Sequence, residues 1–232
     1  MQPVQNIIQL RQLLQEQFPH LRSLPGPSSL QTQPCYPTGL PQIDNLLHGG
    51  LPKGEIIELA STQAGSGNGL IIQCLLRQAY DMRQWIALID GQDCFDPSSL
   101  DQAVLSRLLW VRCGDADQAL KAGDLLLRDG NLPLVLMDLQ INPAAQLRRI
   151  PTSTWYRFQR IIEANETTLL VFTPRALVSK AHVRLSLQSS FAIESLSQSA
   201  EMLLPQIKIK LTRRRSTSSG QSGEQEGTAE VG

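Results

Sequence analysis

The sequence predicts an α/β fold with a mostly parallel sheet flanked by helices. Between Thr38 and about Thr212, short apolar runs take turns with longer segments of helical periodicity. The runs do not alternate between apolar and polar residues, which is typical of strands that are covered on both faces and joined by helices. The last strand-like segments follow one another without a helix between them, so we expect antiparallel strands at the C-terminal end.

The predicted elements follow in a regular order. Strands are expected at 55–60, 85–90, 108–112, 132–139 and 168–174, and helices from about Gly69, over 115–130 and over 153–165. Further strands are expected in the C-terminal segments 182–188, 191–197 and 206–214. Among the aromatic residues, we expect Trp85 and Trp110 in the core, and Trp155 with Tyr156 as a surface pair.

The chain divides into four parts by composition. Residues 1–24 contain an amphipathic helix with apolar residues at three- and four-residue steps, which either packs on its own domain or binds a partner. Residues 25–37 are a linker rich in Pro, Ser and Gln, and residues 38–212 form the α/β domain. Residues 213–232 begin with arginines and continue as a small, polar tail that we expect to be disordered.

The charge balance and the cysteines limit the classes of function. The 21 Lys and Arg residues equal the 21 Asp and Glu residues, which argues against a protein whose main role is to hold phosphate backbones. The four cysteines are scattered without a metal-binding spacing, so we expect reduced thiols and no structural zinc. There is no long apolar run and no secretion signal, which favours a cytoplasmic protein that does not enter a membrane.

A Gly-rich loop follows the first strand of the domain and leads into a helix. Backbone N–H groups and the helix dipole in such an arrangement can hold phosphate groups. The candidate nucleotide-binding residues are Ser61, Gly65, Ser66, Gly67, Asn68 and Gly69, together with Asp138 at the end of the strand at 132–139.

Three segments resemble the RecA-type recombinase core. The run from Gly49 to Glu58 matches the lead-in GGLP-x-G-x-(I/V)-x-E, and WIALIDGQDCFDP (85–97) resembles the strand and turn that carry a catalytic glutamate. Residues 105–139 resemble the next helix and the strand that ends in the Walker B aspartate. The amino-acid sequence of the segment SRLLWVR resembles the ImuA family more closely. The members of this family are RecA-like accessory proteins of bacterial mutagenic DNA repair. The resemblance covers about residues 36–212.

The departures from the RecA pattern concern the residues that act on ATP. A working phosphate-binding loop reads G-x-x-x-x-G-K-[ST], whereas here the lysine position is Gly67 and the hydroxyl position is Asn68. Gln92 stands at the catalytic-glutamate position, and Asp138 is retained at the Walker B position. The resemblance therefore implies a degenerate Walker A loop and no ATP hydrolysis by this chain alone. Residual ATP binding and a loop kept only for its turn geometry both remain open, and Asp138 also fits as a polar end to a buried strand.

The strongest basic run lies at the C-terminal end of the domain. Candidate residues for contact with DNA or an acidic partner are Lys208, Lys210, Arg213, Arg214 and Arg215. The alternative is a strand edge protected by charged residues. The segments 140–154 and 174–184, which correspond to DNA-binding loops of RecA-type proteins, are short here, so we do not expect strand exchange.

The resemblance implies a non-catalytic accessory protein of DNA repair and SOS-type translesion synthesis, with no resident cofactor. Its implied partners are an ImuB-like Y-family polymerase homologue and an error-prone polymerase, RecA being a further candidate, and its contact with DNA is weak or indirect. The alternative is a divergent ATP-binding protein or ATPase that binds single-stranded DNA.

Overall fold

The computed structural model describes residues 34–63 and 65–215. The predicted N-terminal helix, most of the linker and the predicted disordered tail lie outside the described residues. Within those ranges, no helix combines the length and apolar character that crossing a membrane requires.

A seven-stranded sheet forms the centre of the domain, in the order β5-β4-β6-β7-β3-β8-β9. Neighbouring strands are parallel except for the last pair, because β9 is antiparallel to β8. This confirms the predicted fold class. The strands are β3 (Ile56–Ala60), β4 (Ile86–Asp90), β5 (Leu108–Arg112), β6 (Leu134–Asp138), β7 (Thr168–Thr173), β8 (Val183–Leu187) and β9 (Ile209–Arg214).

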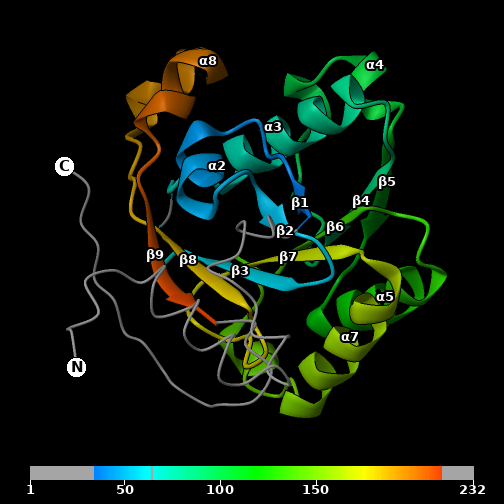
Figure 1. Ribbon diagram of the computed structural model, residues 1–232. Helices are drawn as coiled ribbons and strands as arrows, with labels where there is room; N and C mark the ends of the chain where they lie inside the picture. Colours follow the sequence, from blue (N-terminus) through cyan, green and yellow to red (C-terminus); the bar gives the residue numbers. More distant parts are fainter. Residues whose placement is uncertain (1–33, 64, 216–232) are drawn as a thin grey trace, which may run out of the picture. The chain divides into compact units, whose positions relative to one another are not determined.

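Helices cover both faces of the sheet, as Figure 1 shows. One face carries α2 (Pro41–Leu47), α3 (Asn68–Asp81) and α4 (Gln102–Leu105), and the other carries α5 (Ala116–Asp129) and α7 (Thr152–Asn165). Each layer has its own apolar core, so successive residues of β3 face opposite cores: Ile57 and Leu59 belong to the first and Ile56 to the second. The short helices are α6 (Ala144–Leu147), α8 (Ala200–Leu203) and the 3₁₀ turns η2 (Pro97–Ser99), η3 (Ile193–Ser197) and η4 (Leu204–Gln206).

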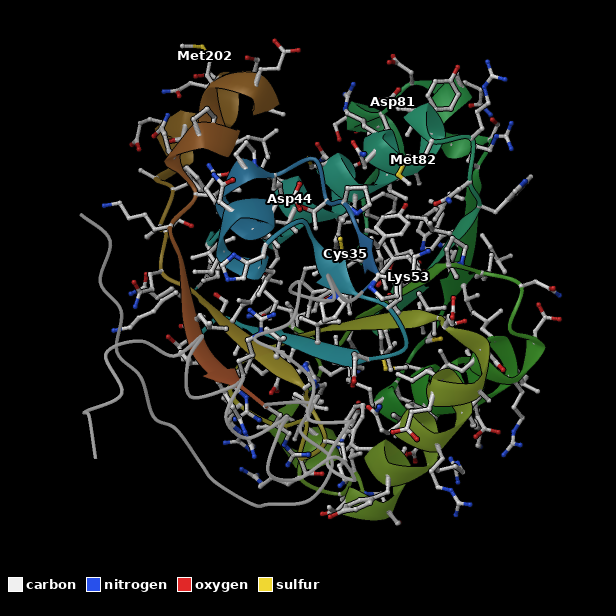
Figure 2. The ribbon with its side chains drawn as sticks, viewed as in Figure 1. Cys35, Asp44, Lys53, Asp81, Met82 and Met202 are labelled. Atoms are coloured by element: carbon white, nitrogen blue, oxygen red, sulfur yellow. The ribbon has the colours of Figure 1, made fainter. Side chains whose placement is uncertain are left out.

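A small hairpin of β1 (Cys35–Tyr36) and β2 (Leu51–Pro52) precedes the sheet. Gly50 has φ +133°, and a Cβ there would lie 2.2 Å from the carbonyl oxygen of Tyr36, so the close approach of the two strands requires glycine. Between the strands, the Asp44 carboxylate accepts hydrogen bonds from the Thr38 hydroxyl at 2.7 Å and the Thr38 N–H at 2.9 Å. Figure 2 shows Asp44 on α2, Cys35 in β1 of the hairpin and Lys53 directly after β2. The ordered unit thus includes residues that composition alone assigns to the linker.

The connection from β7 to β8 is unusual because it contains no helix. Parallel strands are normally joined by a dozen or more residues, often a helix, but here residues 174–182 cross β3 and pack on it directly. The fully buried carboxylate of Glu58 fixes this crossover. It accepts hydrogen bonds from four donors: the Thr173 hydroxyl, the N–H groups of Leu177 and Val178, and the Arg184 guanidinium.

One detail of the predicted C-terminal sheet is wrong. The segment 191–197 is not a strand, since Phe191 leaves the sheet to pack on the Gly-rich loop and a 3₁₀ turn follows. The strands β8 and β9 are antiparallel to each other, as predicted, and β8 also pairs in parallel with β3, because the crossover returns the chain to the opposite end of the sheet before β8 begins.

The aromatic residues are distributed differently from the prediction. Trp85 is 51% exposed, because it precedes β4 and lies outside the sheet, whereas Trp155 is buried against Phe158. Tyr156 is exposed, as expected, and Trp110 is only half-buried, with its indole N–H 3.3 Å from the Asp90 carboxylate.

Candidate functional site

The Gly-rich loop lies at the carboxyl edge of the sheet, where ligands of parallel α/β sheets bind. The loop leaves β3 at Ser61, whose N–H donates to the Thr173 carbonyl at 2.9 Å. The Gln140 amide donates to the Ser61 carbonyl at 2.8 Å and thereby ties the loop to the end of β6. The fold therefore brings the predicted loop residues and Asp138 to one edge, through Gln140.

The middle of the loop is held by the segment that follows β8. The Phe191 N–H donates to the Gly65 carbonyl at 2.9 Å, and the Ser189 hydroxyl donates to the Ser66 carbonyl at 2.7 Å. Both serines are buried. The backbone of this part of the loop is thus bonded to the protein itself.

Gly67, at the lysine position of the RecA pattern, has a conformation suited to glycine. It has φ +99° and lies immediately before α3. A Cβ at this position would lie 3.0 Å from the ring of Phe191 and 3.7 Å from Cδ1 of Ile207. A lysine would therefore require a strained left-handed backbone and a displacement of the Phe191 ring.

The beginning of α3 keeps some features of an anion-binding helix end. No side chain caps this end of the helix, so its first N–H groups are not satisfied by a cap. Asn68, at the hydroxyl position, has a buried Oδ1 without a hydrogen-bond partner among the described residues. Gly69 is exposed and has no neighbour within 4 Å of its Cβ position.

Two aspartates face each other at the ends of β4 and β6. Asp90 and Asp138 are register partners. The pKa of Asp138 is raised to about 6, mainly by burial and also by the charge of Asp90, although the hydrogen bond from the Gln140 N–H, 2.9 Å from Oδ1, acts to lower it. Asp90 is buried, and its carboxylate accepts hydrogen bonds from the N–H groups of Cys94 and Phe95 and the indole of Trp110.

The loop after β4 is attached to the β5 side of the sheet. The Gln92 amide donates to the Gly114 carbonyl at 3.1 Å, so the side chain at the catalytic-glutamate position lies toward the β5–α5 connection. Asp93 forms a two-point ion pair with Arg112 at 2.6 and 2.7 Å, and this arginine lies over the ring of Trp110. These contacts hold the loop after β4 in place, and none of them involves the Gly-rich loop.

The predicted basic residues lie on β9 and just beyond it. Lys208 is exposed, and Lys210 pairs in register with Ser186. A β-bulge at Thr212 places Arg213 opposite Arg184, while Arg214 is exposed opposite Val183. The Arg215 N–H donates to the His182 carbonyl at 2.9 Å. Burial, followed by the charges of Arg214 and Arg215, lowers the pKa of His182 to about 4.

Two features that matter at this edge were not predicted from the sequence. Phe191 covers the loop, and Glu58 anchors the crossover. The signals are a single large apolar residue after the polar run Gln188–Ser190, and an acidic residue between two apolar pairs in the strand IIELA. Within the described residues, no group of three or more His, Cys, Asp or Glu side chains could hold a metal ion.

Part of this chain is similar to bacterial RecA proteins. RecA from Acinetobacter baumannii (strain ATCC 17978) is 28% identical over 127 residues, which cover 53% of this chain and 36% of that protein. RecA from Methylococcus capsulatus (strain Bath) is 29% identical over 116 residues, 48% of this chain and 33% of that protein. RecA from Xylella fastidiosa (strain M12) is 26% identical over 127 residues, 53% of this chain and 36% of that protein.

This similarity supports a place in the RecA-like superfamily. The parallel sheet and its flanking helices are consistent with a RecA-like core. No family model matches the chain. The chain spans about a third of the length of the RecA proteins that it matches.

Proposed function

We propose that this chain is a RecA-like protein of DNA repair that acts as a non-catalytic accessory in SOS-type translesion mutagenesis. The similarity to RecA supports a role related to DNA repair or recombination. The resemblance of residues 105–139 to the ImuA family supports the narrower role. Its partners are then an ImuB-like Y-family polymerase homologue and an error-prone polymerase, with RecA as a further candidate.

The single observation that carries the non-catalytic role is the packing of Phe191 on Gly67. Phosphoryl transfer on a RecA-like loop needs a lysine that reaches the β- and γ-phosphates. Here the backbone at that position is left-handed, and an aromatic ring lies where the side chain would begin. The loop is therefore built to be covered by the chain's own C-terminal segment.

The loop after β4 supports the same proposal. A general base must reach the water that attacks the γ-phosphate, and an amide cannot accept its proton as a carboxylate does. The Gln92 amide instead donates a hydrogen bond to the Gly114 carbonyl, and the Asp90 carboxylate accepts hydrogen bonds from three N–H donors. Both side chains stabilise the loop conformation, and in this role neither takes part in catalysis.

The test of this proposal is an ATPase and ATP-binding assay on the full chain, with a RecA protein as the positive control. We expect no ATP hydrolysis by the chain, with or without single-stranded DNA. Hydrolysis that is lost in Asp138→Ala would overturn the non-catalytic role. Because Asp138→Ala could act through misfolding, Lys121→Ala, an exposed substitution on α5, serves as the control for preparation and concentration.

A second candidate function is a divergent ATP-binding protein that binds single-stranded DNA. The retained Asp138 at the sheet edge and the unpartnered Oδ1 of Asn68 at the start of α3 favour it. It predicts saturable binding of a fluorescent ATP analogue that weakens in both Asp138→Ala and Asn68→Ala. It also predicts binding of single-stranded DNA that falls steeply as the salt concentration rises.

The accessory role itself is tested with purified partners. The full chain is immobilised and challenged separately with the Y-family polymerase homologue, the error-prone polymerase and RecA of the same organism. We expect one of the two polymerase-related proteins to bind directly in the absence of ATP. Binding to none of the three would overturn the accessory role.

A further inference from the structure

The strand β9 is an edge of the sheet: within the described part of the chain it pairs with β8 alone. The Lys208 carbonyl accepts from the Gln188 N–H at 2.8 Å, so this residue uses its main-chain groups toward β8. In an antiparallel ladder these directions alternate along the strand. The main-chain groups of Ile209 and Leu211 therefore point outward, where an additional strand can pair with them.

The side chains of β9 form two different rows. Ile209 and Leu211 are half-buried against the core under α2 and α3, whereas Lys208 and Lys210 lie on the opposite face. Neither lysine forms an ion pair with another described residue. In the described part of the chain, the edge thus combines two lysines without an ion pair on one face with an apolar row on the other.

The bulge at Thr212 extends the basic row and limits the length of regular pairing. Because the extra residue shifts the alternation by one position, Arg213 falls on the same face as Lys210. The Thr212 hydroxyl donates to the Arg184 carbonyl at 3.0 Å and holds the bulge in place. The regular part of the open edge is therefore residues 208–211, with positive charge continuing beyond it.

The opposite edge of the sheet lacks this charge excess. There, Arg112 of β5 is neutralised by its two-point ion pair with Asp93. Among the described residues, Lys208 and Lys210 thus have no ion pair, whereas the charged residue of the opposite edge strand has one.

We propose that the open edge of β9 takes up an extended acidic segment of a partner protein as an additional strand. Carboxylates at alternate positions lie opposite Lys208 and Lys210, and the apolar side chains between them extend the row of Ile209 and Leu211. A nucleic acid would use the lysines but would leave the outward main-chain groups and the apolar row without partners, so a polypeptide fits better. This inference deepens the proposed function and rests on it for the existence of a partner.

The test is a binding assay of the full chain with a fluorescent peptide in which glutamate and valine alternate. The matched control peptide has the same composition with its glutamates grouped at one end. We expect only the alternating peptide to bind, and we expect Lys208→Glu/Lys210→Glu to weaken its affinity by about tenfold or more, because two cross-strand attractions become repulsions. Lys121→Glu, which reverses one exposed charge on α5, should leave the affinity unchanged.

Four results would overturn the proposal. Equal binding of the grouped peptide, or of an alternating peptide N-methylated at every valine, would show diffuse charge attraction and no added strand. Tighter binding of an oligothymidylate through the same two lysines would make nucleic acid the occupant. If Glu224→Gln/Glu226→Gln/Glu230→Gln in the full chain tightened peptide binding about tenfold, the occupant would be the chain's own acidic residues.

A fifth result, obtained with a purified partner, separates this inference from the proposed function. If a purified polymerase-related partner binds the wild-type chain and Lys208→Glu/Lys210→Glu with equal affinity, the accessory role stands and the β9 site is wrong. If the peptide binds as expected but no polymerase-related protein binds, the edge site stands and the proposed role is wrong.

Discussion

Two carboxylates of the sheet, one fully buried and one half-buried, have opposite surroundings. Glu58, in the middle of β3, is fully buried and accepts hydrogen bonds from four donors, one of which is the Arg184 guanidinium. Asp138, at the end of β6, has one N–H donor and a second carboxylate as its register partner, and its pKa is raised to about 6. The first is an anion that the fold neutralises, and the second is an anion that the fold leaves poorly compensated.

The comparison of Glu58 with Asp138 distinguishes an acidic residue that has a structural role from one that is a candidate for a functional role. A buried charge that is fully hydrogen-bonded holds neighbouring segments together, here the helix-free crossover and β8. A half-buried carboxylate whose surroundings disfavour its ionised form gives no such stabilisation, and groups with strongly shifted pKa values are common at functional sites. Asp138 is therefore a better candidate for a functional role than for a stabilising one.

The largest expected effect is the loss of stability in Glu58→Gln. The substitution keeps the shape of the side chain but leaves Arg184, only 19% exposed, without its counter-charge and turns one acceptor into a donor that faces other donors. We expect a loss of about 3–5 kcal/mol in the free energy of unfolding. Urea denaturation followed by circular dichroism measures it.

The matched control for this substitution is Glu201→Gln, an exposed residue of α8, which should change stability within error. In the same helix, Figure 2 shows the exposed Met202 pointing away from the sheet. A loss below about 1 kcal/mol in Glu58→Gln would mean that the crossover does not depend on the buried charge, and the contrast with Asp138 would disappear.

Replacing the carboxylate of Asp138 with an amide, in Asp138→Asn, should stabilise the protein, whereas Glu58→Gln destabilises it. Since the folded-state pKa of Asp138 lies above the usual value for aspartate, the folded chain binds this proton more tightly than the unfolded chain. The contribution of this group is favourable below pH 4 and is lost as the pH rises to about 6. Asp138→Asn has no carboxylate to ionise, so it avoids this loss of stability at higher pH, and its amide oxygen still accepts a hydrogen bond from the Gln140 N–H. We expect the substitution to stabilise the protein by about 2 kcal/mol at pH 7.5.

The measurement is the difference in unfolding free energy between wild type and Asp138→Asn at pH 7.5 and at pH 4. We expect the difference to shrink toward zero at the lower pH. The difference is needed because His182, whose pKa is lowered to about 4, acts in the opposite direction: its contribution is lost as the pH falls from about 6.5. A destabilised Asp138→Asn at pH 7.5 would show that the carboxylate is compensated after all.

The fold class could be predicted because it depends on patterns that the sequence states directly. Strands such as IIELA are apolar on both faces, and a covered parallel sheet is the arrangement that buries them. The parallel pairing of β8 with β3 could not be predicted, because it depends on a helix-free crossover held by Glu58 and Arg184, two residues 126 positions apart. Such a buried pair leaves no local periodicity in the sequence.

The candidate loop was located from its glycines, but its covering was not. The positions of Gly67 and Asn68 follow from the spacing between strand and helix, which is local information. The contact of Phe191 with Gly67 joins segments far apart in the chain and ends a predicted strand, so strand propensity at 191–197 gave way to a tertiary contact. Trp155 likewise became core because α7 turns its side chain toward Phe158, which residue type alone does not reveal.

The smallest expected effect concerns a single one of the hydrogen bonds that the Glu58 carboxylate accepts. Thr173→Val removes the hydroxyl that lies 3.0 Å from Oε1 of Glu58, while the two backbone N–H groups and Arg184 remain. A hydrogen bond from a hydroxyl to a charged carboxylate contributes about 1.5 kcal/mol or more, so we expect a loss of about 1.5 kcal/mol in the free energy of unfolding. Thr168→Val is the matched control, since Thr168 is also buried in β7 but donates to the Pro52 carbonyl.

In the Glu58→Gln background, the loss of unfolding free energy caused by Thr173→Val should change, while the loss caused by Thr168→Val stays the same, because only coupled residues show non-additive effects. Equal costs of Thr173→Val in both backgrounds would mean that the hydroxyl does not act through Glu58, and that the crossover is held by the backbone donors and Arg184 alone.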